Sequence, residues 1–235
     1  MIIVNNPHNP TGKVFTATEL EEIAAVAREH DLIVASDEVY EHLVFDGLAH
    51  TPMASLPGMA ARTLTISSGG KTFASTGWKV GWVHGPPEFI AAVAVVKQFV
   101  TFSGSAAFQP AIAHGLGLPD AFFGDLANSL QRRRDLLVRA LTDLGLTVAP
   151  TQGTYFVVAD VGAWGVKDAT QWCRDLPAAA GVAAIPVAAF CTDRRTAPTL
   201  VRFAFCKDEA VLSEGVRRLA LFADPVASAA AESLP

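Results

Sequence analysis

The chain has 235 residues, of which 51% are hydrophobic and 17% are charged, and its formal net charge is −5. This length allows one domain or two with a large buried core, and the apolar content excludes an intrinsically disordered chain. The mild acidity argues against a protein whose main role is to bind nucleic-acid phosphates.

The first half of the chain is predicted to alternate strands and helices. Residues 1–4 form an apolar run typical of a strand buried on both faces, which suggests that a section of a larger protein precedes it. Thr18 and Glu21 have capping-box spacing for a helix over residues 18–29, and a strand follows at 32–35. Strand, helix and strand in this order predict a βαβ unit with parallel strands. Further strands are expected at 63–67 and 80–83, and a helix at 87–100.

The second half is predicted to have a different organisation. A leucine stripe predicts one long helix over residues 120–144, with Gly145 as its C-cap. The expected strands that follow are 146–149, 154–159, 182–185 and 200–205, the expected helices are 169–175 and 209–222, and a frayed tail is expected at 227–235. We therefore expect part of a large α/β domain at 1–119, a connecting helix at 120–144 and a small α+β domain at 145–235.

The sequence also indicates the compartment. The apolar run at residues 89–96 ends at Lys97, far short of the roughly 20 residues that a membrane helix needs. The N-terminus lacks the basic region and the cleavage site of a signal peptide. Cys173, Cys191 and Cys206 are too widely spaced for a disulfide framework or a C-x-x-C motif. We expect a soluble, cytoplasmic protein without a membrane partner.

Polar side chains are concentrated in loops that follow the predicted strands, where open α/β sheets place functional groups. Residues 5–12 (NNPHNPTG) hold the amide of Asn9 in place through two prolines and a glycine, although the same composition is common in an ordinary turn. In residues 36–40 (SDEVY), Asp37 could pair with a cation and Tyr40 could donate to an oxyanion. The alternative for Asp37 is the N-cap of a helix.

A third loop, residues 67–72 (SSGGKT), follows the strand expected at 63–67. Its end is similar to a phosphate loop of nucleotide-binding proteins, but Thr65 occupies the position where that motif needs glycine. Lys71 can instead be a partly desolvated amine that is nucleophilic toward a carbonyl, or an exposed loop lysine.

Further cations of interest lie outside the three loops. Lys79 lies between two tryptophans, and Arg202 lies inside an apolar strand, where a guanidinium needs an internal carboxylate or a ligand carboxylate as its partner. Residues 132–134 (RRR) are expected to form a solvated helix face rather than a nucleic-acid contact. The six histidines show no metal-ligand spacing, so we expect no metal site.

Four segments together resemble the class I/II aminotransferases. They are residues 5–12, 36–40, 68–81 (SGGKTFASTGWKVG) and 201–205 (VRFAF). These enzymes have fold-type I and use pyridoxal 5′-phosphate (PLP), and the likeness is strongest to kynurenine, glutamine, methionine and N-succinyldiaminopimelate aminotransferases. The resemblance implies a large PLP-binding domain, truncated at its N-terminus, with a mostly parallel sheet and helices on both faces. A smaller α+β domain would follow, and the full-length protein would be a homodimer.

The resemblance implies a role for each residue around the cofactor. Lys71 would bind PLP covalently as an internal aldimine and would later move the substrate proton. Asp37 would keep the pyridine nitrogen protonated, so that the ring accepts electrons. Tyr40 and Asn9 would hydrogen-bond the phenolate oxygen of the ring.

The remaining implied roles concern the cofactor phosphate and the substrate. Ser68 and Lys79 would bind the phosphate, with Lys79 at a position where many relatives have arginine. Arg202, together with Asn9, would bind the substrate α-carboxylate. The implied reaction is ping-pong transamination between an α-amino acid and a 2-oxo acid, carried out by the full-length protein. The alternatives are β-elimination from cysteine S-conjugates on the same scaffold, an inactive fragment, and a module that binds a full-length partner.

Overall fold

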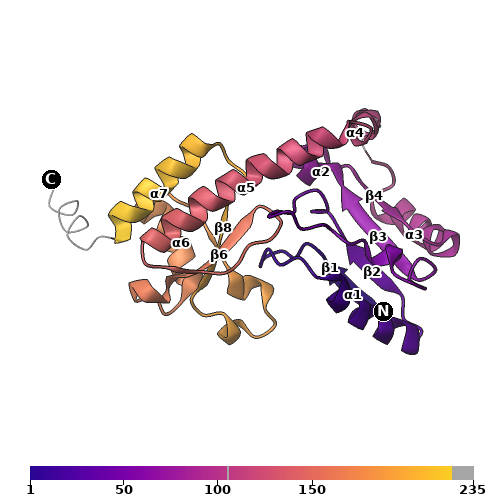
Figure 1. Cartoon of the computed structure of the whole chain (residues 1–235), viewed down its shortest axis with the longest axis horizontal. Helices are drawn as coiled ribbons and strands as arrows, with labels where there is room; N and C mark the ends of the chain where they lie inside the picture. The colour runs from indigo at the N-terminus through magenta and orange to yellow at the C-terminus, as the bar shows by residue number, and fades with distance from the viewer. Residues whose placement is uncertain (105, 224–235) are drawn as a thin grey trace. The chain divides into compact units, whose positions relative to one another are not determined.

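The computed structural model describes residues 1–104 and 106–223 (Figure 1). These residues form two compact units: Met1–His8 with Lys13–Ala127, and Asn9–Gly12 with the residues from Asn128 on. The division falls within the long helix, and the three-part division at 119 and 145 stays a prediction. The frayed tail expected at 227–235 lies outside the described residues.

The first unit is built on a four-stranded sheet. Its strands, in spatial order, are β1 (Ile2–Asn5), β2 (Val34–Asp37), β3 (Thr63–Ser68) and β4 (Gly81–His84). The first three strands are parallel, and β4 is antiparallel to β3, so the expected mostly parallel sheet is confirmed. Asn5 lies opposite Asp37, which lies opposite Ile66. The loops that follow these three strands therefore begin at one edge of the sheet.

Strand β1 is an edge strand of this sheet and pairs with β2. Val4 is buried, whereas the side chain of Ile3 is 74% exposed. The prediction that this strand is buried on both faces was therefore wrong for the described residues. Helix α1 covers the face that carries Val4, and no described element covers Ile3.

Helix α1 (Ala17–Glu29) begins earlier than predicted. Thr16, not Thr18, is the N-cap: its hydroxyl accepts the Glu19 N–H at 3.2 Å, and the Glu19 carboxylate accepts the Thr16 N–H at 2.9 Å. Both threonines have a glutamate three residues later, so the sequence offers two capping boxes. Lys13 favours the earlier one, because its Nζ lies 2.6 Å from the Glu19 carboxylate.

The apolar side of α1 packs on the sheet. The core consists of Val4, Leu20, Ala24, Ala27, Val34, Met53 and Met59. The other helices of this unit are α2 (Gly69–Thr72), α3 (Pro87–Val100) and α4 (Gln109–Leu116). Helix α3 has the predicted bounds, but it buries none of its residues, and its Phe99 is 83% exposed. Helix α4 was not predicted from the sequence.

The second unit is a small α+β structure, as expected. Its antiparallel sheet has the order β5 (Thr147–Val148), β6 (Phe156–Asp160), β8 (Leu200–Ala204) and β7 (Ile185–Pro186). Its helices are the C-terminal part of α5 (Asp120–Asp143), α6 (Ala169–Ala180) and α7 (Glu209–Ala223) (Figure 1). Helix α6 continues past the expected end at 175 through Pro177, and Gly181 caps it in a left-handed conformation.

Candidate functional site

Lys71 lies in the short helix α2, directly after β3. The two glycines before it allow this helix to pack closely against its neighbours. A Cβ on Gly69 would lie 2.5 Å from the side chain of Ile112, and one on Gly70 would lie 3.1 Å from Cα of Thr76. Larger residues at these positions would displace the helix, so the glycines determine where the amine of Lys71 is held.

Asp37 and Tyr40 lie close to Lys71. The Lys71 Nζ is 5.9 Å from the centroid of the Tyr40 ring, which is buried. Burial raises the pKa of Asp37 above its ordinary value, although the Val39 N–H and the positive charge of Lys71 both act to lower it. Asp37 is the last residue of β2, and residues 39–42 form a turn rather than a helix, so the alternative of Asp37 as a helix N-cap was wrong. The structure thus brings together an amine, a carboxylate and a phenol.

Ser68 and Lys79 line one cavity with Lys71. The cavity has a volume of about 300 Å³, and Thr76, Val80 and Gly81 complete its lining together with Gly70. Lys79 is exposed and has a left-handed backbone with φ +56°, after the short turn Thr76–Trp78. A hydroxyl and two ammonium groups therefore surround a space that is suited to an anion.

In the second unit, the structure brings Arg202 and Asn9 together. The Arg202 Nη1 donates to the Asn9 Oδ1 at 2.7 Å. The guanidinium carbon lies 3.9 Å from the centroid of the Phe156 ring and 4.8 Å from that of Phe190. The contacts of Arg202 thus include an amide oxygen and two aromatic rings, and they restrain the position of the guanidinium.

The loop that carries Asn9 is attached to the second unit through Gly12. The Gly12 carbonyl accepts the N–H groups of Gln152 and Gly153, both at 2.8 Å. Gly12 has φ +72°, and a Cβ there would lie 2.9 Å from Cγ2 of Thr151. Both the backbone conformation and the close approach therefore require glycine. The ordinary-turn interpretation of residues 5–12 does not account for this attachment.

The arginine run at 132–134 does not form a uniformly solvated face. Arg134 is buried, its Nη1 donates to the Thr151 carbonyl at 2.8 Å, and its Nε donates to Asp135 at 2.8 Å. The prediction was therefore wrong for Arg134. The reason is the turn of the helix: residues 132 and 134 are about 200° apart around the axis, so they face different surroundings.

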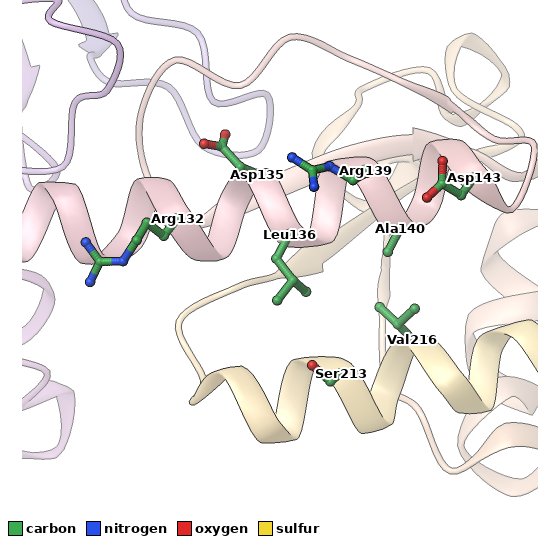
Figure 2. A pocket seen from close by; sticks show the side chains of 8 residues that line it. All are labelled: Arg132, Asp135, Leu136, Arg139, Ala140, Asp143, Ser213 and Val216. Carbon is green, nitrogen blue, oxygen red and sulfur yellow. The ribbon is translucent and has the colours of Figure 1, made fainter.

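A groove of about 460 Å³ lies between α5 and α7 (Figure 2). Figure 2 shows Leu136 and Ala140 pointing toward Val216, whereas Asp135 and Arg139 lie on the side of α5 away from α7. The charged side chains of α5 at this groove alternate in sign at spacings of three and four residues, a pattern common on solvent-exposed helix faces. They are Arg132, Asp135, Arg139 and Asp143. None of the predicted site residues lines this groove, and it carries no reactive set.

Four residues that contribute to these sites were not singled out from the sequence. Thr76 lines the cavity next to Lys71, Phe190 contacts Arg202, and Glu38 forms a buried pair with His50. The sequence offered one signal: Glu38 directly follows β2 and lies two residues after Ser36, so in an extended chain the two side chains would point to the same side. Nothing local in the sequence identifies the other three.

Metal and membrane sites are not found in the part of the chain that the structure describes. Within residues 1–104 and 106–223, no three His, Cys, Asp or Glu side chains gather as a metal site requires. Over the same ranges, no helix combines the length and the apolar character needed to cross a membrane.

Comparisons with known proteins agree on one family. Residues 1–219 match the family Aminotransferase class I and II. The chain is 48% identical over 231 residues to a probable N-succinyldiaminopimelate aminotransferase, DapC, of Mycobacterium tuberculosis, covering 95% of the chain and 58% of that protein. It is 44% identical to a kynurenine–oxoglutarate transaminase of Dictyostelium discoideum, covering 91% of the chain and 54% of that protein.

Solved structures give the same result. The N-succinyldiaminopimelate aminotransferase of Mycobacterium tuberculosis superposes with a TM-score of 0.90 at 50% identity, covering 94% of this chain and 57% of that one. A methionine aminotransferase of Escherichia coli superposes with a TM-score of 0.86 at 35% identity, covering 93% and 57%. The chain thus spans somewhat more than half the length of the relatives it matches.

Proposed function

Because the chain belongs to the class I and II aminotransferases, we propose that the complete protein transfers the amino group of an α-amino acid to a 2-oxo acid. Membership of this family implies PLP as the cofactor. One observation carries the proposal for this chain: Lys71, Asp37 and Tyr40 lie together where strands β2 and β3 end. An amine, a carboxylate and a phenol are the groups that this cofactor needs.

The residues present fit PLP. Burial disfavours the charged form of Asp37. A cation opposite it, such as a protonated pyridine nitrogen, would stabilise the ionised carboxylate. The cavity lined by Ser68 and Lys79 offers a hydroxyl and an ammonium to the phosphate. A Cβ at Gly81 would lie 2.9 Å from the Ser67 carbonyl, so glycine keeps this side of the cavity lining close to β3.

When bound, PLP supplies an aldehyde for amine exchange and a ring that accepts the electrons of the substrate Cα–H bond. Lys71 would hold the aldehyde carbon through its amine and, once that amine is free again, would move the proton at the substrate Cα. Asp37 would keep the ring nitrogen protonated. Tyr40 would donate to the ring oxygen, and Ser68 and Lys79 would hold the phosphate.

Arg202 and Asn9 are proposed to bind the substrate. The Arg202 guanidinium presents a planar pair of donors, and a carboxylate can accept both of them. Contact with Asn9 and two aromatic rings reduces the freedom of Arg202 before the substrate arrives. Because every α-amino acid and every 2-oxo acid carries this carboxylate, one arginine can serve both halves of the reaction.

Transamination is favoured over β-elimination by the relatives, whose names are those of aminotransferases and transaminases. We further propose that the complete protein is a cytoplasmic homodimer. The three cysteines of the chain are free in the structure, which suits a reducing compartment, and light scattering of the complete protein tests the dimer.

The test is spectroscopic. Purified protein is mixed with PLP, and the absorbance of the bound cofactor is recorded for the unaltered chain and for Lys71→Ala. We expect a band distinct from that of free PLP only with Lys71 present. Addition of an amino acid without any 2-oxo acid should then convert the bound cofactor to its amine form in the complete protein. Identical spectra for the two proteins would refute the proposal.

A further inference from the structure

Two adjacent carboxylates at the end of β2 have opposite surroundings. The Asp37 side chain is half-buried, lies near Lys71 and accepts a long hydrogen bond, 3.4 Å, from the Val39 N–H. The Glu38 side chain is almost fully buried. Because consecutive residues of an extended chain point to opposite sides, the orientation of Glu38 also determines that of Asp37.

Glu38 is held by three donors. Its Oε1 accepts the Ser36 hydroxyl at 2.7 Å and the Met53 N–H at 3.0 Å, and its Oε2 lies 2.8 Å from the His50 Nε2. Burial alone would raise the pKa of Glu38, but these bonds outweigh it, so the pKa lies below its ordinary value. The carboxylate is therefore ionised, and the His50 Nε2 acts as the donor.

The backbone after Glu38 is attached to the same framework. The Glu38 N–H donates to the Ile66 carbonyl at 2.8 Å, and the Glu41 N–H donates to the Glu38 carbonyl at 2.9 Å. The Glu41 carboxylate accepts the Ser67 hydroxyl at 2.8 Å. Hydrogen bonds thus hold the turn on both sides of Tyr40, through Glu38 before it and through Glu41 after it. The partner of Glu41 is Ser67, the residue next to Ser68.

We propose that Glu38 is a positioning residue, which fixes the turn of residues 37–41 so that Asp37 and Tyr40 are presented to the cofactor beside Lys71. This inference rests on the proposed function. Glu38 itself touches neither the cofactor nor the substrate. Without its carboxylate, Ser36, His50 and the Met53 N–H lose their common acceptor, and the turn that carries two cofactor contacts is released at one end.

The test compares four variants of the purified chain. Glu38→Ala removes the acceptor. Glu38→Gln keeps an oxygen for Ser36 and Met53, and its amide can donate to the His50 Nε2 once the ring proton moves to Nδ1, which is buried and has no partner among the described residues.

Two core variants are the controls. Val158→Ala removes a buried side chain of the other core cluster, which shares no residue with the turn or with the donors to Glu38. Leu20→Ala adds a loss of core packing in the cluster that contains Met53.

Two readouts are used. Hydrogen exchange of residues 36–43 is measured without cofactor, and the dissociation constant of PLP is measured by absorbance. For Glu38→Ala we expect exchange in the turn to be about tenfold faster or more, since buried bonds to a charge are lost. PLP binding should weaken about tenfold to a hundredfold, since misplaced groups lose most of their effect. Glu38→Gln should recover part of both losses, because Ser36 and Met53 keep their acceptor, whereas the charge is lost and a proton on the buried His50 Nδ1 would have no acceptor among the described residues.

The outcomes separate this inference from the proposed function. If the turn exchanges no faster in Glu38→Ala than in the two controls, the positioning role is wrong, even when the unaltered chain binds PLP. Values for Glu38→Gln that lie no nearer to those of the unaltered chain than the values for Glu38→Ala would also overturn it. If the unaltered chain binds no PLP but exchange accelerates selectively in Glu38→Ala and is partly restored in Glu38→Gln, the positioning of the turn stands and the proposed cofactor role fails.

Discussion

Substitution of Gly12 by alanine should release the loop that carries Asn9. Gly12 has φ +72°, and a Cβ would lie 2.9 Å from Cγ2 of Thr151 and 3.2 Å from the Gly153 carbonyl. Gly145 offers a matched control in the same unit. It has φ +82°, but a Cβ there would meet nothing within 4 Å. Both substitutions impose the same backbone strain, and only Gly12→Ala adds a steric clash.

The expected magnitudes follow from these contacts. A left-handed conformation costs an alanine about 1–2 kcal/mol relative to glycine. In Gly12→Ala the clash adds about 1–3 kcal/mol. Displacement of the Gly12 carbonyl from the N–H groups of Gln152 and Gly153 costs about 1 kcal/mol for each bond. We therefore expect losses in the free energy of unfolding of about 5.5 kcal/mol for Gly12→Ala and about 1.5 kcal/mol for Gly145→Ala.

Thermal unfolding followed by circular dichroism measures the difference. For a chain of this size, the midpoint should fall by about 15 °C in Gly12→Ala and by about 4 °C in Gly145→Ala. In the complete protein, Gly12→Ala should also raise KM for the amino acid, because Asn9 no longer restrains Arg202. Equal losses of stability in the two variants would refute the reasoning, since the clash and the two hydrogen bonds would then contribute nothing.

Three further predictions concern other parts of the second unit. Arg202→Lys keeps the positive charge but loses the planar pair of donors. The kcat/KM of the complete protein should therefore fall about tenfold to a hundredfold for every class of amino donor. A loss confined to one class would exclude Arg202 as the α-carboxylate ligand. Burial raises the pKa of the Cys173 thiol from 9.0 to about 11. The folded chain thus holds this proton more tightly, so the free energy of unfolding should fall as the pH rises from 9 to 11; a Cys173→Ala variant with an unchanged pH slope would contradict this. Arg134→Met should lower the free energy of unfolding in urea by about 1–3 kcal/mol, because the buried Thr151 carbonyl loses its donor. Arg132→Met on the exposed side should lower it by less than about 0.5 kcal/mol. Equal losses would show that Arg134 is not the buried member of the run.

Local patterns were sufficient to predict much of the first unit. Short apolar runs predicted the strands near β1 and β2, and the β-branched residues at 63–67 predicted the strand near β3. The sequence singled out Lys71 after two glycines, but the close packing of these glycines against Ile112 and Thr76 is known only from the structure. The expectation that polar loops follow strand ends placed Asp37 and Lys71 close together, as the structure has them.

The features that were missed depend on contacts distant in sequence. The family resemblance implied that Asn9 and Arg202 act together although they are 193 residues apart, but no local pattern indicates that the loop of residues 5–12 is attached to the second unit through Gly12. Arg134 is buried because Thr151 presents a carbonyl to it, which the run of three arginines does not reveal. The reversed direction of β4 and the burial of Glu38 against His50 likewise follow from tertiary packing rather than from periodicity.

The central claim is that Lys71 is the amine that binds PLP, and covalent trapping tests it most directly. The purified chain is incubated with PLP, reduced with borohydride and digested, and the peptides are identified by mass spectrometry. We predict a pyridoxyl group on the peptide containing Lys71, and its absence from that peptide in Asp37→Ala at the same PLP concentration. A pyridoxyl group on Lys79 or Lys13 with none on Lys71 would contradict the claim.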